Sequence, residues 1–209
     1  MRPNSEAASS TERIEALSDN IFAVAMTLLI VNIRVPQNHG IDDAAHVWAL
    51  IVPLWHHLRA FSLSFLIIGL FWVAHHRVFM LIERSDAGLL LINLALMGFT
   101  VLTPLSTGLL GQFDGSRVAL TLYGINIMCI SLALQGAWWY ATFRRRLVDP
   151  QLEREVIRRN TLRNMLVPAI CVVAIAVSFV SPKMSLLIYL LTPLSLFWSF
   201  RKRAESSPV

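Results

Sequence analysis

The chain has 209 residues, of which 56% are hydrophobic and only 15% are charged, and its mean hydropathy is +0.60. This composition excludes an ordinary soluble globular domain, in which about 25% of the residues are charged. The net charge of +5 does not indicate nucleic-acid binding, because the basic residues lack interleaved aromatic residues on a soluble module.

The first predicted membrane span covers residues 14–36. The 20 residues from Ala16 to Val35 form a helix of about 30 Å, which is the thickness of the hydrocarbon core of a bilayer. The preceding residues are polar and lack an apolar stretch before a cleavage site, so we expect no signal peptide and a retained span. Asp19 is costly in lipid and is therefore expected to face protein or water.

One side of this first helix carries a stripe of residues at helical spacing. Val24, Thr27, Leu28 and Val31 recur at i, i+3, i+4 and i+7, and Asn20 continues the stripe toward the N-terminus. From periodicity alone, a helix-packing seam is favoured over a pore lining. If the stripe instead surrounded a symmetry axis, its apolar rings would form narrow constrictions that gate by dewetting, with one hydroxyl layer between them.

Further apolar runs predict additional spans at about residues 47–76, 87–110, 118–142, 162–180 and 184–201. We therefore predict an all-α integral membrane protein with six transmembrane helices, in a single domain over residues 1–203. Residues 144–163 are predicted to form a basic amphipathic helix at the membrane surface. Residues 204–209 are expected to be a disordered tail.

The basic residues predict the orientation of this multi-pass protein. Fourteen of the 18 lysines and arginines lie on one side of the predicted membrane: Arg2, Arg13, Arg77, Arg84, Arg144, Arg145, Arg146, Arg154, Arg158, Arg159, Arg163, Arg201, Lys202 and Arg203. The others lie on the opposite side: Arg34, Arg59, Arg117 and Lys183. By the positive-inside rule both termini are cytoplasmic, and the net charge reflects orientation and attraction to the lipid bilayer.

Asp19 requires polar partners from another helix. Arg13 precedes it by six residues, about 240° around a helix, so the two side chains do not face each other. The end of the second span supplies Trp72, His75 and His76 at the same side of the membrane. A network of these residues with Arg13, Ser18 and Asp19 would either serve as structural glue or tie a gate-bearing helix to its neighbour.

Polar and small residues inside the third and fourth spans favour close helix packing. Asn93, Asn126 and Gln135 can cross-link spans by hydrogen bonds, and Pro104 is expected to kink its helix. Small residues that allow close approach of the helices stand at four positions: Gly98, Gly108, Gly124 and Gly136.

The sequence offers little support for a metal site or an enzyme. Adjacent histidines such as His75 and His76 point about 100° apart on a helix and form a poor metal clamp. Cys129 and Cys171 lie inside predicted spans and suggest no disulfide or redox motif. No catalytic constellation is visible, so we expect no cofactor and no enzymatic activity. A proton pathway or proton-coupled transporter using Asp19 and the membrane histidines stays open, as does a non-conducting scaffold.

The two polar motifs together resemble a known family. Arg13-x-x-x-Leu17-Ser18-Asp19, followed by Ala23-Val24-x-x-Thr27-Leu28-Leu29 and Val35-Pro36, resembles the Arg-x-x-x-Phe-Ser-Asp signature of the endosomal and lysosomal potassium channel family, in its single-repeat prokaryotic form. Trp72-x-x-His75-His76-Arg77-x-Phe79 is similar to the second-span motif of that family. The resemblance implies a homotetramer of six-span subunits in a prokaryotic inner membrane, in which the first helices line a pore for passive potassium flux without a carbonyl-lined filter.

The resemblance also implies roles for individual residues. Val24, Leu28 and Val31 would form the hydrophobic constriction, and Thr27 would supply a hydroxyl layer that potassium contacts transiently. The interhelical network below the gate would consist of Arg13, Ser18, Asp19, Trp72, His75 and His76.

The chain departs from the family pattern at four positions. Leu17 replaces the usual Phe, and Ala74 replaces an amide before the histidine pair. Val24 stands where a larger aliphatic residue is common, and a smaller side chain there would loosen the constriction. Asn32 stands where an acid is frequent, which would weaken cation attraction at the outer mouth.

Overall fold

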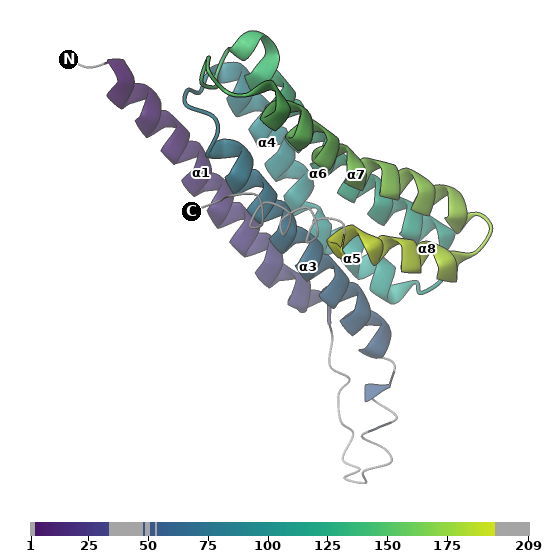
Figure 1. Cartoon of the computed structure of the whole chain (residues 1–209). Coiled ribbons are helices and arrows are strands. Elements are labelled where there is room, and N and C mark those ends of the chain that lie inside the picture. The colour runs from purple at the N-terminus through teal and green to yellow at the C-terminus, as the bar shows by residue number, and fades with distance from the viewer. Residues whose placement is uncertain (1–2, 34–47, 49–50, 53, 195–209) are drawn as a thin grey trace, which may run out of the picture.

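The computed structural model describes residues 3–33, 48, 51–52 and 54–194, and the regular elements in this part of the chain are helices (Figure 1). The all-α prediction is therefore confirmed. In chain order the elements are α1 (Pro3–Leu28), η1 (Leu29–Asn32), α3 (Leu54–Phe79), α4 (Ala87–Val101), α5 (Thr103–Gln112), α6 (Arg117–Thr142), η2 (Phe143–Arg145), α7 (Arg154–Ser178) and α8 (Pro182–Tyr189).

Five helical stretches of the described residues are long and apolar enough to cross a membrane: Thr11–Asn32, Leu54–Phe79, Ala87–Gln112, Arg117–Arg145 and Arg154–Ser178. Of the sixth predicted span, 184–201, the structure describes residues 184–194, and the first of these lie in α8. Residues 34–36 of the first span, residues 47, 49–50 and 53 of the second, residues 195–201 and the predicted tail 204–209 lie outside the described residues.

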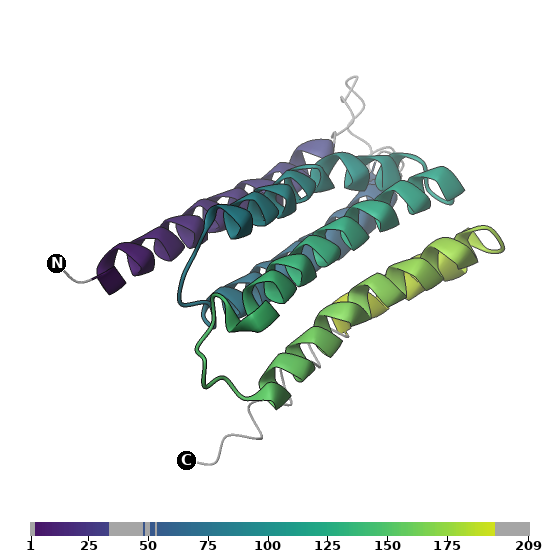
Figure 2. The ribbon, with the colours of Figure 1, turned by 90° about the horizontal axis from the view of Figure 1, so that it is seen from above.

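The long helices lie side by side, with α1 at one edge and α7 with α8 at the opposite edge (Figure 2). Helix α1 packs against α3 and α4, α4 packs against α6, and α6 packs against α7. Between them lies a core of buried aromatic and aliphatic side chains, including Phe22, Phe71, Tyr123 and Trp138. Many outward-facing leucines and valines stay exposed in the single chain, as expected where lipid or further subunits cover the surface.

Local sequence determines where several helices start and where one breaks. Asp86, Ser116 and Ser181 each stand directly before a helix, and each side chain accepts a hydrogen bond from a backbone N–H three residues on. These are N-caps that satisfy otherwise unpaired donors of the first turn. The break between α4 and α5 falls at Leu102, because Pro104 has no N–H to donate four residues back and its ring clashes there.

The connector before the fifth span differs from the prediction of a separate surface helix over 144–163. The chain leaves η2 with Arg144 and Arg145 at positive φ, forms an isolated bridge between Ile82 and Val148, and starts α7 at Arg154. Pro150 interrupts helix formation before that point, since its ring makes the α conformation unfavourable for the preceding residue. From Arg154 the helix runs without a break, with Pro168 inside it, to Ser178, and it therefore includes the predicted fifth span 162–180 up to that residue.

Candidate functional site

Helix α1 has one face buried in the protein. Ser18, Phe22, Ala25 and Leu29 are almost fully buried, and their spacing of four, three and four residues places them on one side of the helix. This side contacts α3 and α4. These three apolar residues and Ser18 therefore determine which side of α1 is turned away from the subunit.

The opposite face of α1 is exposed and carries the predicted stripe. Val24, Leu28 and Val31 are 54%, 42% and 67% exposed, and Thr27 between them and Asn20 before them are exposed as well. The structure thus places all four predicted constriction and hydroxyl residues on one outward surface of the single chain.

The two polar side chains of this surface present acceptors to the outside. Thr27 donates its hydroxyl proton to the carbonyl of Val24 at 2.8 Å, and Asn20 donates from Nδ2 to the carbonyl of Ala16 at 2.8 Å. The hydroxyl lone pairs of Thr27 and the amide oxygen of Asn20 remain available. Oxygen atoms of this kind are the ligands that hard cations prefer.

A chain of hydrogen bonds connects the buried face of α1 with α4 and α3. Ser18 donates to the carbonyl of Ile14 at 2.8 Å, and Asn93 of α4 donates from Nδ2 to the Ser18 oxygen at 3.0 Å. Since the Asn93 nitrogen is used in this way, its Oδ1 accepts from His75 Nε2 of α3 at 2.9 Å. The His75 ring therefore carries its proton on Nε2 and links three helices through one amide.

The His75 ring is enclosed by aromatic side chains. It stacks on Phe79 with ring centroids 4.2 Å apart and lies at 5.7 Å from the Phe22 ring. Its Nδ1 is buried and has no hydrogen-bond partner among the described residues. This arrangement holds a neutral imidazole in one orientation.

A second, more exposed contact ties α1 to α3. Trp72 donates from Nε1 to Asp19 Oδ1 at 2.8 Å, and its ring stacks against His76 at a centroid distance of 6.5 Å. His76 Nδ1 lies 4.0 Å from a Glu15 carboxylate oxygen. The carboxylates of Asp19 and Glu15 therefore both face the C-terminal end of α3.

Arg13 lies apart from this network in the single chain. Arg13 is exposed and, within the described part of the subunit, makes no interaction with the residues of this network. It instead lines a cavity of about 680 Å³ together with Leu17, Asp86 and Leu90. The reason is helical geometry: Arg13 precedes Val31 by 18 residues, about five full turns, and so belongs to the outward face.

The prediction for the network omitted Asn93 and Glu15. The position of Asn93 in the middle of an apolar span was the available signal, because such an amide needs partners from other helices. The sequence could not reveal which helix supplied them.

Comparison with known proteins shows the family of this chain. A family model described as endosomal/lysosomal potassium channel TMEM175 matches residues 13–104. A potassium channel of Streptomyces collinus is 32% identical over 194 residues, which cover 91% of this chain and 92% of the relative. The chain belongs to the TMEM175 family. The resemblance inferred from the first-helix motif is thereby confirmed, and the family is one of ion channels, not of enzymes.

Other TMEM175 relatives extend this result. A potassium channel of Chamaesiphon minutus is 34% identical over 83% of this chain and 86% of the relative. The crystal structure of a lysosomal potassium-selective channel TMEM175 homolog from Chamaesiphon minutus superposes with a TM-score of 0.80 at 31% identity, covering 91% of this chain and 98% of that one. The mouse endosomal/lysosomal proton channel TMEM175 is 27% identical over 83% of this chain, which spans 35% of the mouse protein.

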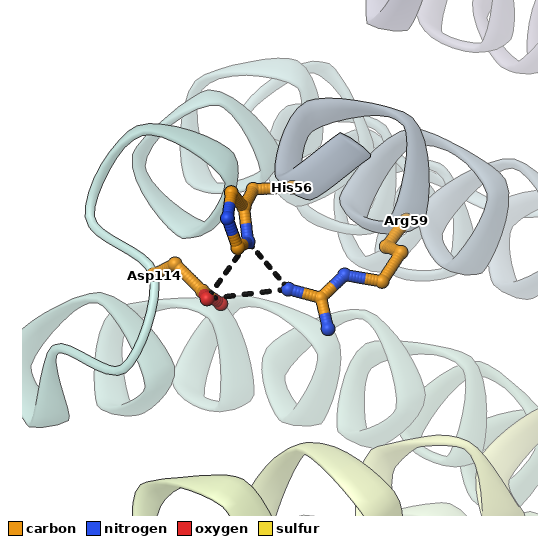
Figure 3. A network of polar contacts seen from close by, with 3 residues as sticks. All are labelled: His56, Arg59 and Asp114. Carbon is orange, nitrogen blue, oxygen red and sulfur yellow. Dashed lines mark hydrogen bonds and ion pairs between the residues drawn. The ribbon is translucent and has the colours of Figure 1, made fainter. Parts of the chain in front are cut away.

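A polar cluster lies near the start of α3 in this TMEM175 subunit (Figure 3). His56 Nδ1 and Arg59 Nη2 from α3 lie 2.8 and 3.2 Å from Asp114 Oδ2 in the loop after α5. His56 Nδ1 also lies 2.6 Å from Arg59 Nη2. Three polar groups thus join the start of α3 to the end of α5.

The end of η1, which directly follows α1, is fixed to α5. Asn32 donates from Nδ2 to the carbonyl of Pro104 at 2.7 Å, and its amide lies against Gly108, where an added Cβ would come to 3.0 Å from the Asn32 oxygen. Beside them a cavity of about 540 Å³ opens next to Val31 and His57. The outward face of α1 therefore ends at a partly polar hollow.

Proposed function

We propose that this chain is the subunit of a potassium-permeable channel, in which α1 of several copies lines the pore. Potassium is the ion named for the bacterial relatives that cover most of this chain. The observation that carries the proposal is the outward face of α1, which stays exposed along the helix and includes Asn20 and Thr27.

This face is unsuited to lipid. An amide and a hydroxyl inside a membrane span are expected to face the interior of an assembly or a water-filled cavity. Both groups direct their donors to the backbone of α1 and leave oxygen acceptors outward. Acceptors favour a cation and disfavour an anion, so the surface suits potassium.

We further propose a homotetramer of six-span subunits, each a single domain over residues 1–203, with both termini in the cytoplasm of a prokaryotic cell. Val24, Leu28 and Val31 would form apolar rings that restrict water and ions, and Thr27 would place a hydroxyl ring between them. Selectivity in such a pore depends on its width and on partial dehydration of the ion, and we expect it to be modest.

The interhelical network would orient this pore face. Ser18, Asn93 and His75 join α1 to α4 and α3 by buried hydrogen bonds, while Asp19 and Trp72 join α1 to α3 near one end. A helix held at both positions cannot rotate to turn its buried face toward the axis.

The test is potassium flux into proteoliposomes that contain the purified protein. Val24→Ala and Leu28→Ala should each raise the flux several-fold, because a wider and less apolar ring lowers the barrier to wetting. Leu91→Ala is the matched control, since Leu91 is 66% exposed on α4 and lies on a different helix. Equal flux in all four proteins, at equal assembly, would reject α1 as the pore lining.

A proton pathway is the second candidate. The vertebrate relatives carry the name proton channel, and Asp19 and His76 are exposed at one end of the outward surface. In the same vesicles, a pH-sensitive dye should report proton flux that Asp19→Asn reduces while potassium flux persists. Saturable flux coupled to a second ion would instead favour a transporter, and single-channel currents would exclude one.

A further inference from the structure

A groove of about 360 Å³ runs between α3 and α8. Its walls include Trp55, Arg59, Ser62 and Leu66 from α3 and Leu187 and Leu190 from α8. We propose that this groove is a phospholipid site, with an acyl chain along the leucines and the phosphate at Arg59. The lipid belongs to the leaflet around the first half of α3, which is the outer leaflet in the orientation proposed above.

The chemistry of the groove changes along its length in the way a lipid requires. The first turn of α3 contributes Trp55, whose amphipathic ring is typical of the membrane interface, and Arg59 and Ser62 follow along the helix. Further along α3 the lining becomes apolar at Leu63 and Leu66. The distance from Trp55 to Leu66 is about 16 Å along the helix, which corresponds to one leaflet of a hydrocarbon core about 30 Å thick.

Arg59 supplies the donor for the headgroup. Its Nη2 contacts Asp114 and His56 (Figure 3), whereas its Nε is buried without a hydrogen-bond partner among the described residues. The Arg59 side chain as a whole is 38% exposed and lines the groove, so the outer part of its guanidinium can donate to a ligand there. A phosphate oxygen matches the planar guanidinium and forms a charge-assisted bond with it.

The phosphate, and not a net negative charge, is the recognised group. Asp114 already neutralises Arg59 at 3.2 Å, so the site offers a hydrogen-bond donor beside a balanced ion pair. Leu187 and Leu190 are 54% and 45% exposed, and a hydrocarbon chain lying on them removes this apolar area from any polar surroundings. Phosphatidylglycerol and phosphatidylcholine should therefore both bind, and diacylglycerol, which has the chains but no phosphate, should bind much less.

Native mass spectrometry of the purified full-length protein tests the proposal with these three lipids of identical acyl chains. For the wild-type protein we expect retention of either phospholipid at least tenfold above that of diacylglycerol. Arg59→Gln should abolish this preference, and Leu187→Trp, which fills the groove, should abolish retention of all three lipids. Arg117→Gln and Leu91→Trp are matched controls. Arg117 is an exposed basic residue at the start of α6, and Leu91 is an exposed leucine of α4; neither lines the groove.

Two results would overturn the site. The first is equal retention of diacylglycerol and phospholipid by the wild-type protein, or unchanged phospholipid retention in both groove variants. The second is efficient cross-linking between copies through Leu66→Cys or Leu187→Cys, which would show that a neighbouring subunit covers the groove. Lipid retention is read without ion flux, so the failure of this proposal and the failure of the channel proposal are separately visible.

Discussion

At the scale of the residue, one amide decides how α1 is attached. Asn93 accepts from His75 and donates to Ser18, so it uses both halves of its side chain in a space closed to water. Leu at that position could make neither bond. The directed order of donors and acceptors also fixes the tautomer of His75.

Replacing Asn93 by Leu should destabilise the protein by about 1–3 kcal/mol, because it leaves the Nε2–H of His75 buried without an acceptor. Thermal unfolding in detergent, followed by intrinsic fluorescence, measures this loss. Gln135→Leu is the control: the Gln135 Oε1 atom is already buried without a partner among the described residues, so this change should be close to neutral. An equal loss in both variants would argue against a specific role for the Asn93 bonds.

At the scale of the element, two glycines allow aromatic hydroxyls to reach their partners. The Tyr189 hydroxyl of α8 donates to the carbonyl of Leu120 at 2.9 Å and lies directly over Gly124 of α6, where an added Cβ would clash with it. In the same way the Tyr140 hydroxyl lies over Gly88 and reaches the Asp86 carboxylate at 3.0 Å. Gly124 thus serves close packing, as its place in a span predicts, and Gly88 does the same at the start of α4.

Gly124→Ala should lower the thermal stability, because Ile175 and the buried ring of Tyr189 cannot both move away. Gly98→Ala offers a direct comparison. It lies inside α4 with nothing within 4 Å of an added Cβ, and alanine has the better helix propensity. We expect Gly98→Ala to be neutral or stabilising in the same unfolding measurement, and a similar loss for both variants would contradict the packing explanation.

Asp86 joins the start of α4 to α6 and to the connector. Its carboxylate accepts from the Leu89 N–H, the Tyr140 hydroxyl and Arg146. Partial burial raises the pKa of Asp86, but the hydrogen bonds from Leu89 and Tyr140 and the charge of Arg146 outweigh it and hold the pKa below the usual value of 3.8. The ionised form is therefore favoured by folding.

The consequence is a stability that depends on pH. A lowered folded pKa gives a contribution that is present above the unfolded pKa and is lost as the pH falls through the folded pKa. Asp86→Asn keeps an N-cap side chain but not the charge, so wild type should be more stable at neutral pH, and the difference should begin to shrink below about pH 4 and disappear once the pH lies below the folded pKa. A difference that stays constant from pH 7 to pH 3 would exclude the charge as its source.

At the scale of the whole molecule, the single subunit leaves a wide apolar surface uncovered. Val24, Leu28 and Val31 of α1 are exposed although they lie in a span whose other face is well packed. Within the described part of a lone subunit these residues, and the polar Asn20 and Thr27 beside them, stay largely uncovered. Several subunits around an axis would cover them.

Cysteine cross-linking tests this arrangement in the membrane. In a background without Cys129 and Cys171, Val31→Cys should form disulfide-linked subunits under oxidation, because four copies would lie close to one another at a narrow axis. Leu91→Cys on α4 should remain uncross-linked. Efficient cross-linking at Leu91 and none at Val31 would place a different helix at the centre.

The sequence by itself determined the class of the protein and most of its helical spans, since these follow from local properties: hydrophobic length, helical period and charge distribution along the chain. It grouped Val24, Thr27, Leu28 and Val31 on one stripe of the first helix, but only the structure showed that this stripe faces away from the subunit. The N-caps and the break before Pro104 are local as well. Only the tertiary structure decided which side chains meet. The first-helix motif grouped Arg13 with the network, whereas in the single subunit the packing of α1 on α3 and α4 turns Arg13 outward and brings in Asn93. A hydrogen bond between residues 75 positions apart depends on how three helices pack together, and no pattern along one helix encodes that arrangement.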